Sequence, residues 1–222
     1  MLVAKAINTD TRVLSTTDSK VEAREHMERI GVNNLPVVDA ETHKLTGHIS
    51  MEALQSVADN ERLIGDFELV EPIKIFSNQH LFHAIRLMLE YELHLLPVID
   101  DEWVFKGIIE KEQVLESLSK MLNLTEYGSI ITVRLNHQDF TLSEVVQLIE
   151  AEGGKILGIT VETPNAEKKQ YEVSIKLNLQ DVSRVASALR RYGYTILTEA
   201  ESESTNIDLE TRADELLKFM DM

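Results

Sequence analysis

A short apolar motif occurs twice in this chain, with its prolines 61 positions apart. Residues 34–39 read Asn-Leu-Pro-Val-Val-Asp, residues 95–100 read Leu-Leu-Pro-Val-Ile-Asp, and each copy is followed by a glycine that opens another apolar stretch. The same offset relates two upstream pairs, Ala23 with Ala84 and Met27 with Met88. A shared structural cause is favoured over coincidence, so the chain contains a duplicated module. Duplicated small modules without a catalytic constellation are expected to bind ligands.

The spacing of apolar residues predicts the same order of elements in both copies. For the first copy it predicts a helix from an N-cap at Asp18 or Ser19 to residue 30, strands over 35–38 and 45–50, and a helix over 51–57. For the second copy it predicts a helical stripe over 81–88, strands over 96–99 and 104–109, and a helix over 114–122. Each strand-helix-strand-strand-helix unit is too small to bury both faces of its sheet alone. We therefore expect the two units to pack together.

A different pattern begins near Gly128, after a linker over residues 123–128. Its apolar residues predict the order βαββαβ, which is the ferredoxin-like arrangement. Thr141 followed three residues later by Glu144 predicts a capping box for the first helix. Farther on, an acidic stretch leads into residues 208–220, where helical spacing predicts a short amphipathic helix. That helix is expected to dock on its own subunit, and gripping a partner is the alternative.

Composition and charge exclude several classes of function. The net charge of -16, from 22 basic and 38 acidic residues, disfavours nucleic acid and anionic membranes as partners. The absence of cysteine excludes disulfides, thiol nucleophiles and thiolate metal sites. With 43% hydrophobic residues but no apolar run of membrane-spanning length and no signal-peptide pattern, the sequence predicts a packed cytoplasmic protein.

The Leu-Pro-Val-[Val/Ile]-Asp strand and the following glycine resemble the CBS domain, which normally occurs as a tandem pair, and the βαββαβ region resembles the ACT domain. The implied fold class is α/β (α+β), with tandem CBS domains (a Bateman module) followed by a ferredoxin-like ACT domain. This order resembles the CBS-ACT proteins of the acetoin-utilization protein B-like group. The predicted boundaries are 1–60 for the first CBS domain, 61–122 for the second, 128–200 for the ACT domain and 201–222 for the acidic tail with its helix.

The CBS resemblance implies a cleft between the two modules that holds an adenine nucleotide. The candidate regulatory ligands are AMP, ADP, ATP and S-adenosylmethionine, and no firm cofactor is implied. The implied nucleotide-binding residues are Asn33, Leu35, Val37, Ser50, His94, Leu96 and Val98. The family's contact motif is glycine, two residues, threonine or serine, two residues and aspartate. The first copy keeps Ser50 but has Ala53 for the aspartate, and the second has Glu110 and Gln113 at the two positions. Ligand binding and an empty dimerisation scaffold therefore stand as equal alternatives.

The ACT resemblance implies an amino-acid site in the loop after the first strand, for which Asn136 and Asp139 are the candidates. The proline-glycine pair of the family is missing there, which makes amino-acid binding a minority hypothesis. Pairing of ACT sheets edge to edge needs only backbone groups, so it remains expected.

Catalysis and metal binding lack a candidate constellation in the sequence. His80 and His83 have a spacing that suits one metal ion, but no third ligand is fixed nearby. Gly153-Gly154-Lys155 lacks the remaining residues of a phosphate-binding loop. We therefore predict a non-enzymatic regulatory homodimer without a catalytic or metal site. The alternatives are an interaction scaffold and an accessory protein of an acetoin or acyl catabolic enzyme.

Overall fold

The computed structural model describes residues 1–136, 141–162 and 170–200. Contacts within the chain divide it into two compact units, Met1–Leu118 and Ser119–Met222. Asp139 and the expected helix over residues 208–220 lie outside the described residues. In the described ranges, no helix has both the length and the apolar content that crossing a bilayer requires.

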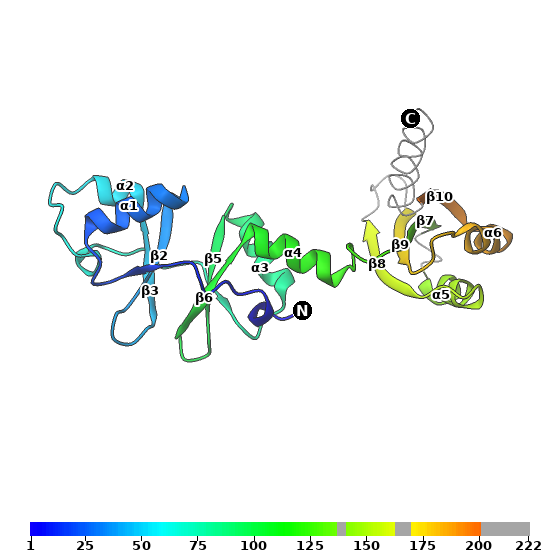
Figure 1. Cartoon of the computed structure of the whole chain (residues 1–222), viewed down its shortest axis with the longest axis horizontal. Coiled ribbons are helices and arrows are strands. Elements are labelled where there is room, and N and C mark those ends of the chain that lie inside the picture. The colour runs from blue at the N-terminus through cyan, green and yellow to red at the C-terminus, as the bar shows by residue number, and fades with distance from the viewer. Residues whose placement is uncertain (137–140, 163–169, 201–222) are drawn as a thin grey trace, which may run out of the picture. The chain divides into compact units, whose positions relative to one another are not determined.

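The first unit contains the two repeats, each with a three-stranded sheet and two helices (Figure 1). The first repeat comprises β1 (Leu14–Ser15), α1 (Lys20–Ile30), β2 (Asn34–Val38), β3 (Leu45–Ser50) and α2 (Met51–Gln55). The second comprises β4 (Ile75–Phe76), α3 (Leu81–Glu90), β5 (Leu95–Ile99), β6 (Phe105–Glu110) and α4 (Lys111–Met121). In both sheets the short first strand is parallel to the second, and the second is antiparallel to the third. The predicted order of elements is confirmed.

The aspartate that ends each motif organises the hairpin turn after it. The Asp39 carboxylate accepts hydrogen bonds from the Thr42 hydroxyl and from two backbone amides of the turn. The bonds from Thr42 hold the pKa of Asp39 below its usual value. The Asp100 carboxylate likewise accepts the amides of Glu102 and Val104, at 3.0 and 2.9 Å. The motif thus ends in aspartate because its side chain satisfies turn amides that no strand pairs with.

The two hairpin turns also join the sheets of the two repeats. The Phe105 amide donates to the His43 carbonyl at 2.9 Å, and the Leu45 amide donates to the Trp103 carbonyl at 3.3 Å. His43 and Trp103 both have left-handed backbone conformations, with φ of 54° and 66°. These contacts confirm the prediction that the two repeats pack together.

Each repeat is completed by the segment that precedes the first strand of the other repeat. In the second repeat the segment is residues 3–8: the Val3 amide donates to the Gln79 carbonyl, and Asn8 pairs with Ile108. In the first repeat residues 64–70 play this part, with equivalent bonds from Ile64 to the Asp18 carbonyl and a pairing of Val70 with His48. The two short 3-10 helices η1 (Val3–Lys5) and η2 (Ile64–Asp66) begin these segments. The segment before the first strand of each repeat therefore packs against the other repeat.

The repeated glycine lies where these segments cross. A Cβ atom on Gly47 would lie 2.5 Å from the Leu69 Cβ, and one on Gly107 would lie 2.4 Å from the Ile7 Cγ2. Real Cβ atoms do not approach so closely, so any larger residue forces the crossing segment outward. This crossing explains why both copies have glycine after the motif.

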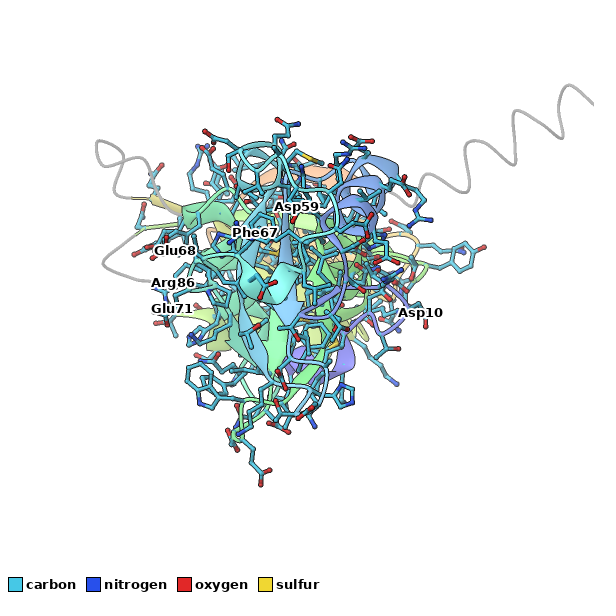
Figure 2. All side chains as sticks on the ribbon, turned by 90° about the vertical axis from the view of Figure 1, so that its left-hand side faces the viewer. Asp10, Asp59, Phe67, Glu68, Glu71 and Arg86 are labelled. Carbon is cyan, nitrogen blue, oxygen red and sulfur yellow. The ribbon has the colours of Figure 1, made fainter. Side chains whose placement is uncertain are left out.

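The surface of the first unit carries many of the acidic groups that make the chain anionic. Asp10, Asp59, Glu68 and Glu71 are all exposed and project into solvent in Figure 2. Phe67, labelled in the same view, is half-buried and carries the Arg62 guanidinium 4.7 Å above its ring centroid. The acidic side chains are thus spread over a solvated surface.

The second unit is a four-stranded antiparallel sheet with two helices. Its elements are β7 (Ser129–Asn136), α5 (Leu142–Ala151), β8 (Ile156–Glu162), β9 (Gln170–Leu177), α6 (Ser183–Arg191) and β10 (Thr195–Ala200). The strand order β10-β7-β9-β8 is that of a ferredoxin-like fold, as predicted. Both helices contribute to one core with the sheet, in which Ile149 and Leu189 are fully buried beside Val133 and Ile175.

The start of α1 matches its prediction and the start of α5 does not. The Ser19 hydroxyl accepts from the Glu22 amide and the Glu22 carboxylate accepts from the Ser19 amide, which completes a capping box. The capping box predicted from Thr141 and Glu144 is wrong, because the Thr141 side chain makes no capping bond. Glu144 instead accepts a hydrogen bond from the hydroxyl of Tyr194, which competes for the same carboxylate.

Candidate functional site

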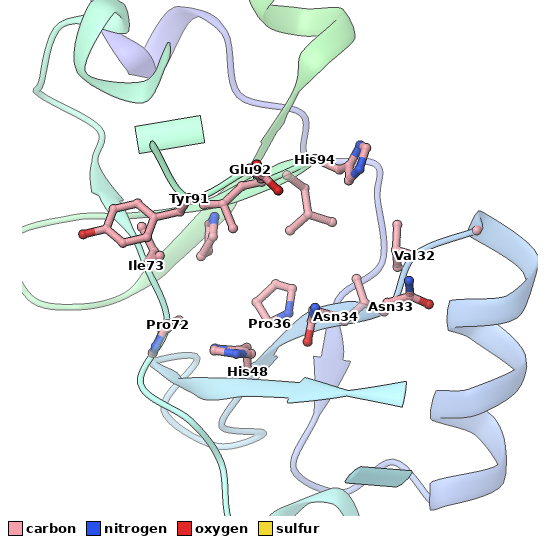
Figure 3. Close-up of a pocket in the computed structure, with 15 residues that line it drawn as sticks. Val32, Asn33, Asn34, Pro36, His48, Pro72, Ile73, Tyr91, Glu92 and His94 are labelled. Carbon is pink, nitrogen blue, oxygen red and sulfur yellow. The ribbon is translucent and has the colours of Figure 1, made fainter. Parts of the chain in front are cut away.

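A cavity of about 350 Å³ lies between the two repeats of the first unit (Figure 3). It is lined by residues 31–36, 72–73 and 91–95, together with His48 and Pro97. Most of the first and third segments are equivalent under the 61-residue offset, so the duplicated module supplies two facing walls. The volume is in the range of about 300–1,000 Å³ that small-molecule sites occupy.

Three of the residues predicted to bind nucleotide line this cavity, and four do not. Asn33, Leu35 and His94 are among the lining residues, although Leu35 is fully buried in the core of the first repeat. Val37, Leu96 and Val98 are fully buried and do not line it. Successive strand residues point to opposite faces, which is why their neighbours Pro36 and Pro97 reach the cavity instead. A role for the buried residues in binding stays a prediction.

Ser50 also lies outside the lining, because its side chain caps α2. The Ser50 hydroxyl accepts the Ala53 amide at 3.1 Å. At the equivalent positions of the second repeat, the Glu110 carboxylate accepts the side-chain amide of Asn8 at 3.1 Å, and Gln113 accepts the Glu110 amide at 3.2 Å. The residues that replace the family's contact motif are therefore engaged in local hydrogen bonds.

The polar groups of the cavity are suited to binding a small molecule and not to catalysis. The side chains of Asn33 and Asn34 each offer two donors and an acceptor. His48 is half-buried, and burial lowers the pKa of its imidazole, so the ring is neutral at pH 7. Tyr91 is 49% exposed at the cavity, where its ring offers a flat apolar face. Together these groups present hydrogen bonds and apolar surface without a nucleophile activated by a base.

Several cavity residues were missed by the sequence analysis. Pro72 and Ile73 belong to the linker between the repeats, and His48 belongs to β3. Tyr91 and Glu92 follow α3, beside the predicted strand segment. Hydrophobic periodicity identifies strands but does not show which linker approaches them. The proximity of Tyr91 and Glu92 to the motif was the one available signal.

His80 and His83, the pair with metal-ligand spacing, lie at the N-cap and in the first turn of α3. The Nδ1 atom of His80 accepts the Phe82 amide at 3.2 Å, so this ring caps the helix. Among the described residues, no group of three or more His, Cys, Asp or Glu side chains is arranged to hold a metal ion.

Residues 64–120 match the family model of the CBS domain. The second repeat is a CBS domain. The first repeat has the same strands and helices, the same turn aspartate and the same crossing glycine, so the first unit is a CBS domain pair. The cavity described above therefore lies between two CBS domains.

Three known proteins that are similar to this chain align with about half of it. An inosine-5'-monophosphate dehydrogenase from Methanocaldococcus jannaschii is 29% identical over 107 residues, which is 48% of this chain and 21% of the relative. The chain thus spans about a fifth of the length of that curated relative. A CBS domain pair/ACT domain protein from Thermotoga maritima is 25% identical, and the alignment covers 53% of this chain and 96% of that one with a TM-score of 0.48. CBSX2 in complex with AMP, a protein of Arabidopsis thaliana, is 25% identical over 53% of this chain and 95% of its own, with a TM-score of 0.44.

A second cavity, of about 560 Å³, lies in the ferredoxin-like unit. Asn136, one of the two amino-acid-binding candidates, lines it and accepts a hydrogen bond from the Gln170 side chain at 3.2 Å. The other candidate, Asp139, is outside the described residues. Amino-acid binding at this place stays a prediction.

Tyr194, which also lines this second cavity, gives the unit a measurable dependence on pH. Burial, followed by the hydrogen bond to the Glu144 carboxylate, raises the pKa of Tyr194 to about 12. Because this folded-state pKa exceeds the ordinary value of 10.0, the protonated Tyr194 hydroxyl adds to the free energy of unfolding. This contribution is complete below pH 10 and is lost as pH rises toward 12. We expect urea unfolding of Tyr194→Phe to show a smaller loss of stability in that range than the wild type. Tyr192→Phe, at a residue 62% exposed, is the matched control and should keep the wild-type profile.

Proposed function

We propose that this protein is a non-enzymatic regulatory protein whose CBS domain pair binds an adenine nucleotide or a related adenosine compound in the cavity between the repeats. The observation that carries the proposal is the cavity itself. It has the volume of a small-molecule site and is built by equivalent segments of two CBS domains. Binding there would change the packing of the two domains and hence the surface offered to a partner.

The walls of the cavity suit a purine. Pro36, Pro72 and Pro97 supply rigid apolar surface against which a flat ring can pack. Asn33 and Asn34 supply both donors and acceptors, which is the combination that the amino group and ring nitrogens of adenine require. These two features support an adenine ring as the part of the ligand that is held between the repeats.

Isothermal titration of the full chain with AMP, ADP, ATP, S-adenosylmethionine and adenosine tests the proposal. We expect saturable binding, with a dissociation constant on the order of micromolar, for at least one of them. Asn34→Leu should weaken that binding about tenfold, because the amide is replaced by a group of similar size without hydrogen bonds. Ser50→Ala is the control: it removes a helix cap outside the cavity and should leave the affinity unchanged in folded protein.

The opposite result for the two variants would contradict this placement. If Ser50→Ala abolished binding and Asn34→Leu did not, the ligand would contact the family motif rather than this cavity. If none of the five compounds bound, the alternative of an interaction scaffold with an empty cavity would be favoured. A link to an acetoin or acyl catabolic enzyme stays a prediction from the family resemblance.

We further propose that the chain forms a homodimer through the helices of its second CBS domain. The duplication provides an internal comparison, because the same helical surface exists twice. In the first domain this surface carries Arg24 and Glu28, whose side chains form an ion pair of 3.7 Å. The equivalent positions of the second domain are Ile85 and Leu89, and Leu89 is 75% exposed. The fold therefore does not require an apolar surface here.

The second helix of each domain repeats this contrast. After the motif one residue is missing from the second copy, so the offset falls to 60, as between Gly47 and Gly107. Leu115 of α4 is 69% exposed, and its equivalent in α2 is the exposed Gln55. Together the apolar side chains of α3 and α4 line a groove of about 520 Å³. Lys111 and Glu92 line the same groove, so its charges are of both signs. A two-fold axis through the groove would set apolar surface against apolar surface, which favours a second copy as the occupant.

A further inference from the structure

Glu92 stands at a backbone position where the duplicate has glycine. It follows α3 with φ of +53°, and its equivalent Gly31 follows α1 with φ of +71°. Glycine adopts this left-handed conformation freely, whereas a glutamate is strained in it. A strained residue that replaces a permissive one calls for a function of its side chain.

Glu92 lines both the ligand cavity and the groove of α3 and α4, and its exposed side chain has no ion-pair partner among the described residues. Its carboxylate lines the space between the repeats, beside Tyr91 and across from Asn34 and Pro36 in Figure 3. In residues 1–136, 141–162 and 170–200, no hydrogen bond or salt bridge engages this carboxylate. The left-handed backbone at Glu92 lets the Leu93 amide close α3 on the Met88 carbonyl at 2.9 Å, as the Val32 amide does on Met27 in the duplicate, but this bond does not involve the Glu92 side chain.

The remainder of the cavity lining does not supply positive charge. No lysine or arginine is present among its described residues, and Glu92 is its one carboxylate. His48 contributes a neutral ring, and Asn33 and Asn34 are uncharged. A phosphate bound here would face a carboxylate without a cationic side chain to offset the repulsion.

We propose that Glu92 makes this cavity selective for an uncharged or cationic adenosine compound and against phosphorylated ones. A carboxylate has two oxygens and can accept both vicinal hydroxyls of a ribose. It also attracts a sulfonium or ammonium group. The inference rests on the proposed function, since it names which adenosine compounds the same cavity accepts. It also gives a role in this chain to a carboxylate outside the family motif, whose aspartate positions hold Ala53 and Gln113.

Titration of the full chain with four compounds tests the selectivity. Adenosine and S-adenosylmethionine are expected to bind at least about tenfold more tightly than AMP, with ATP the weakest. Glu92→Gln, which removes the charge and keeps the shape, should bring the affinities for AMP and adenosine together. Glu90→Gln is the matched control, because this exposed carboxylate ends the same helix outside the lining and should leave the ratio unchanged.

A readout independent of binding comes from Glu92→Gly. This variant restores the residue of the duplicate, so it should raise the midpoint of urea unfolding while it loses the discrimination against AMP. A stability gain together with a loss of selectivity is the pattern expected of a residue kept for ligand recognition.

The outcomes separate this inference from the function on which it rests. If no adenosine compound bound, both would fail. If they bound but AMP or ATP bound as tightly as adenosine, the selectivity would be overturned and the proposed function would stand. If the expected order were found but Glu92→Gln left it unchanged, another group would set the selectivity and the role of Glu92 would be overturned.

Discussion

Gly107→Ala is expected to detach the N-terminal segment from the second CBS domain and to lower the free energy of unfolding by about 3 kcal/mol or more. The backbone at Gly107 has φ of +140°, which L side chains rarely adopt. An added Cβ would also lie 2.6 Å from the Asn8 carbonyl oxygen. To avoid this overlap, Asn8 must move away from Ile108, and the two backbone hydrogen bonds of 2.8 and 3.0 Å between them are lost.

Urea unfolding followed by tryptophan fluorescence measures this effect, because the single tryptophan, Trp103, lies in the second repeat. Gly31→Ala is the control for backbone strain alone. Gly31 has φ of +71°, but a Cβ there meets nothing within 4 Å, so a loss of about 1 kcal/mol is expected. Equal losses in the two variants would show that strain accounts for the effect and that the crossing segment does not hold the domain.

Leu115→Glu is expected to weaken self-association of the chain at least about a hundredfold, because it places a charge in the apolar groove of the proposed dimer. The leucine is exposed, so the substitution should leave the fold of the monomer intact. Sedimentation velocity over about 1–100 µM protein compares the association of the variant with that of the wild type. Gln55→Glu, at the equivalent position of the first domain, is the matched control and should associate as the wild type does.

Two results would contradict the proposed interface. A wild type that is monomeric over the whole range would show that the groove does not join two copies under these conditions. A dimer that survives Leu115→Glu but dissociates with Gln55→Glu would place the interface on the first domain. Either result would leave the ligand cavity as proposed, because Leu115 and Gln55 do not line it.

The duplication made most of the fold predictable from the sequence. The paired motifs located β2 and β5, and alternating residues such as Val133 and Leu135 identified the strands of the second unit. Ser19 predicted the start of α1 because its capping partner Glu22 is local. The capping box at Thr141 failed in both halves: the Thr141 hydroxyl makes no capping bond, and the Glu144 carboxylate binds Tyr194, 50 residues away and invisible to local spacing. Local chemistry was therefore predictable where tertiary contacts did not compete with it.

The cavity was less predictable than the fold, for reasons visible at single residues. The motif located the right strands, but the residues assigned to the ligand alternate along one face of each strand, and on that face Val37, Leu96 and Val98 lie in the core. Pro72 reaches the cavity through a linker whose path depends on the packing of the two repeats. Glu92 escaped notice because its significance lies in a backbone angle that the sequence does not state. Comparison with Gly31 identifies the position once the alignment of the repeats is known.

The segments that pack against the other repeat have a consequence for the order of events during synthesis on the ribosome. The first domain needs residues 64–70, so it can close as soon as the chain has been made to about residue 70. The second domain needs residues 3–8 against Ile108, so this early stretch must stay accessible while about a hundred further residues are added. An interval of this length, at about 5–20 residues per second, lasts several seconds. A premature partner for residues 3–8 would leave the second domain incomplete while the first is already folded.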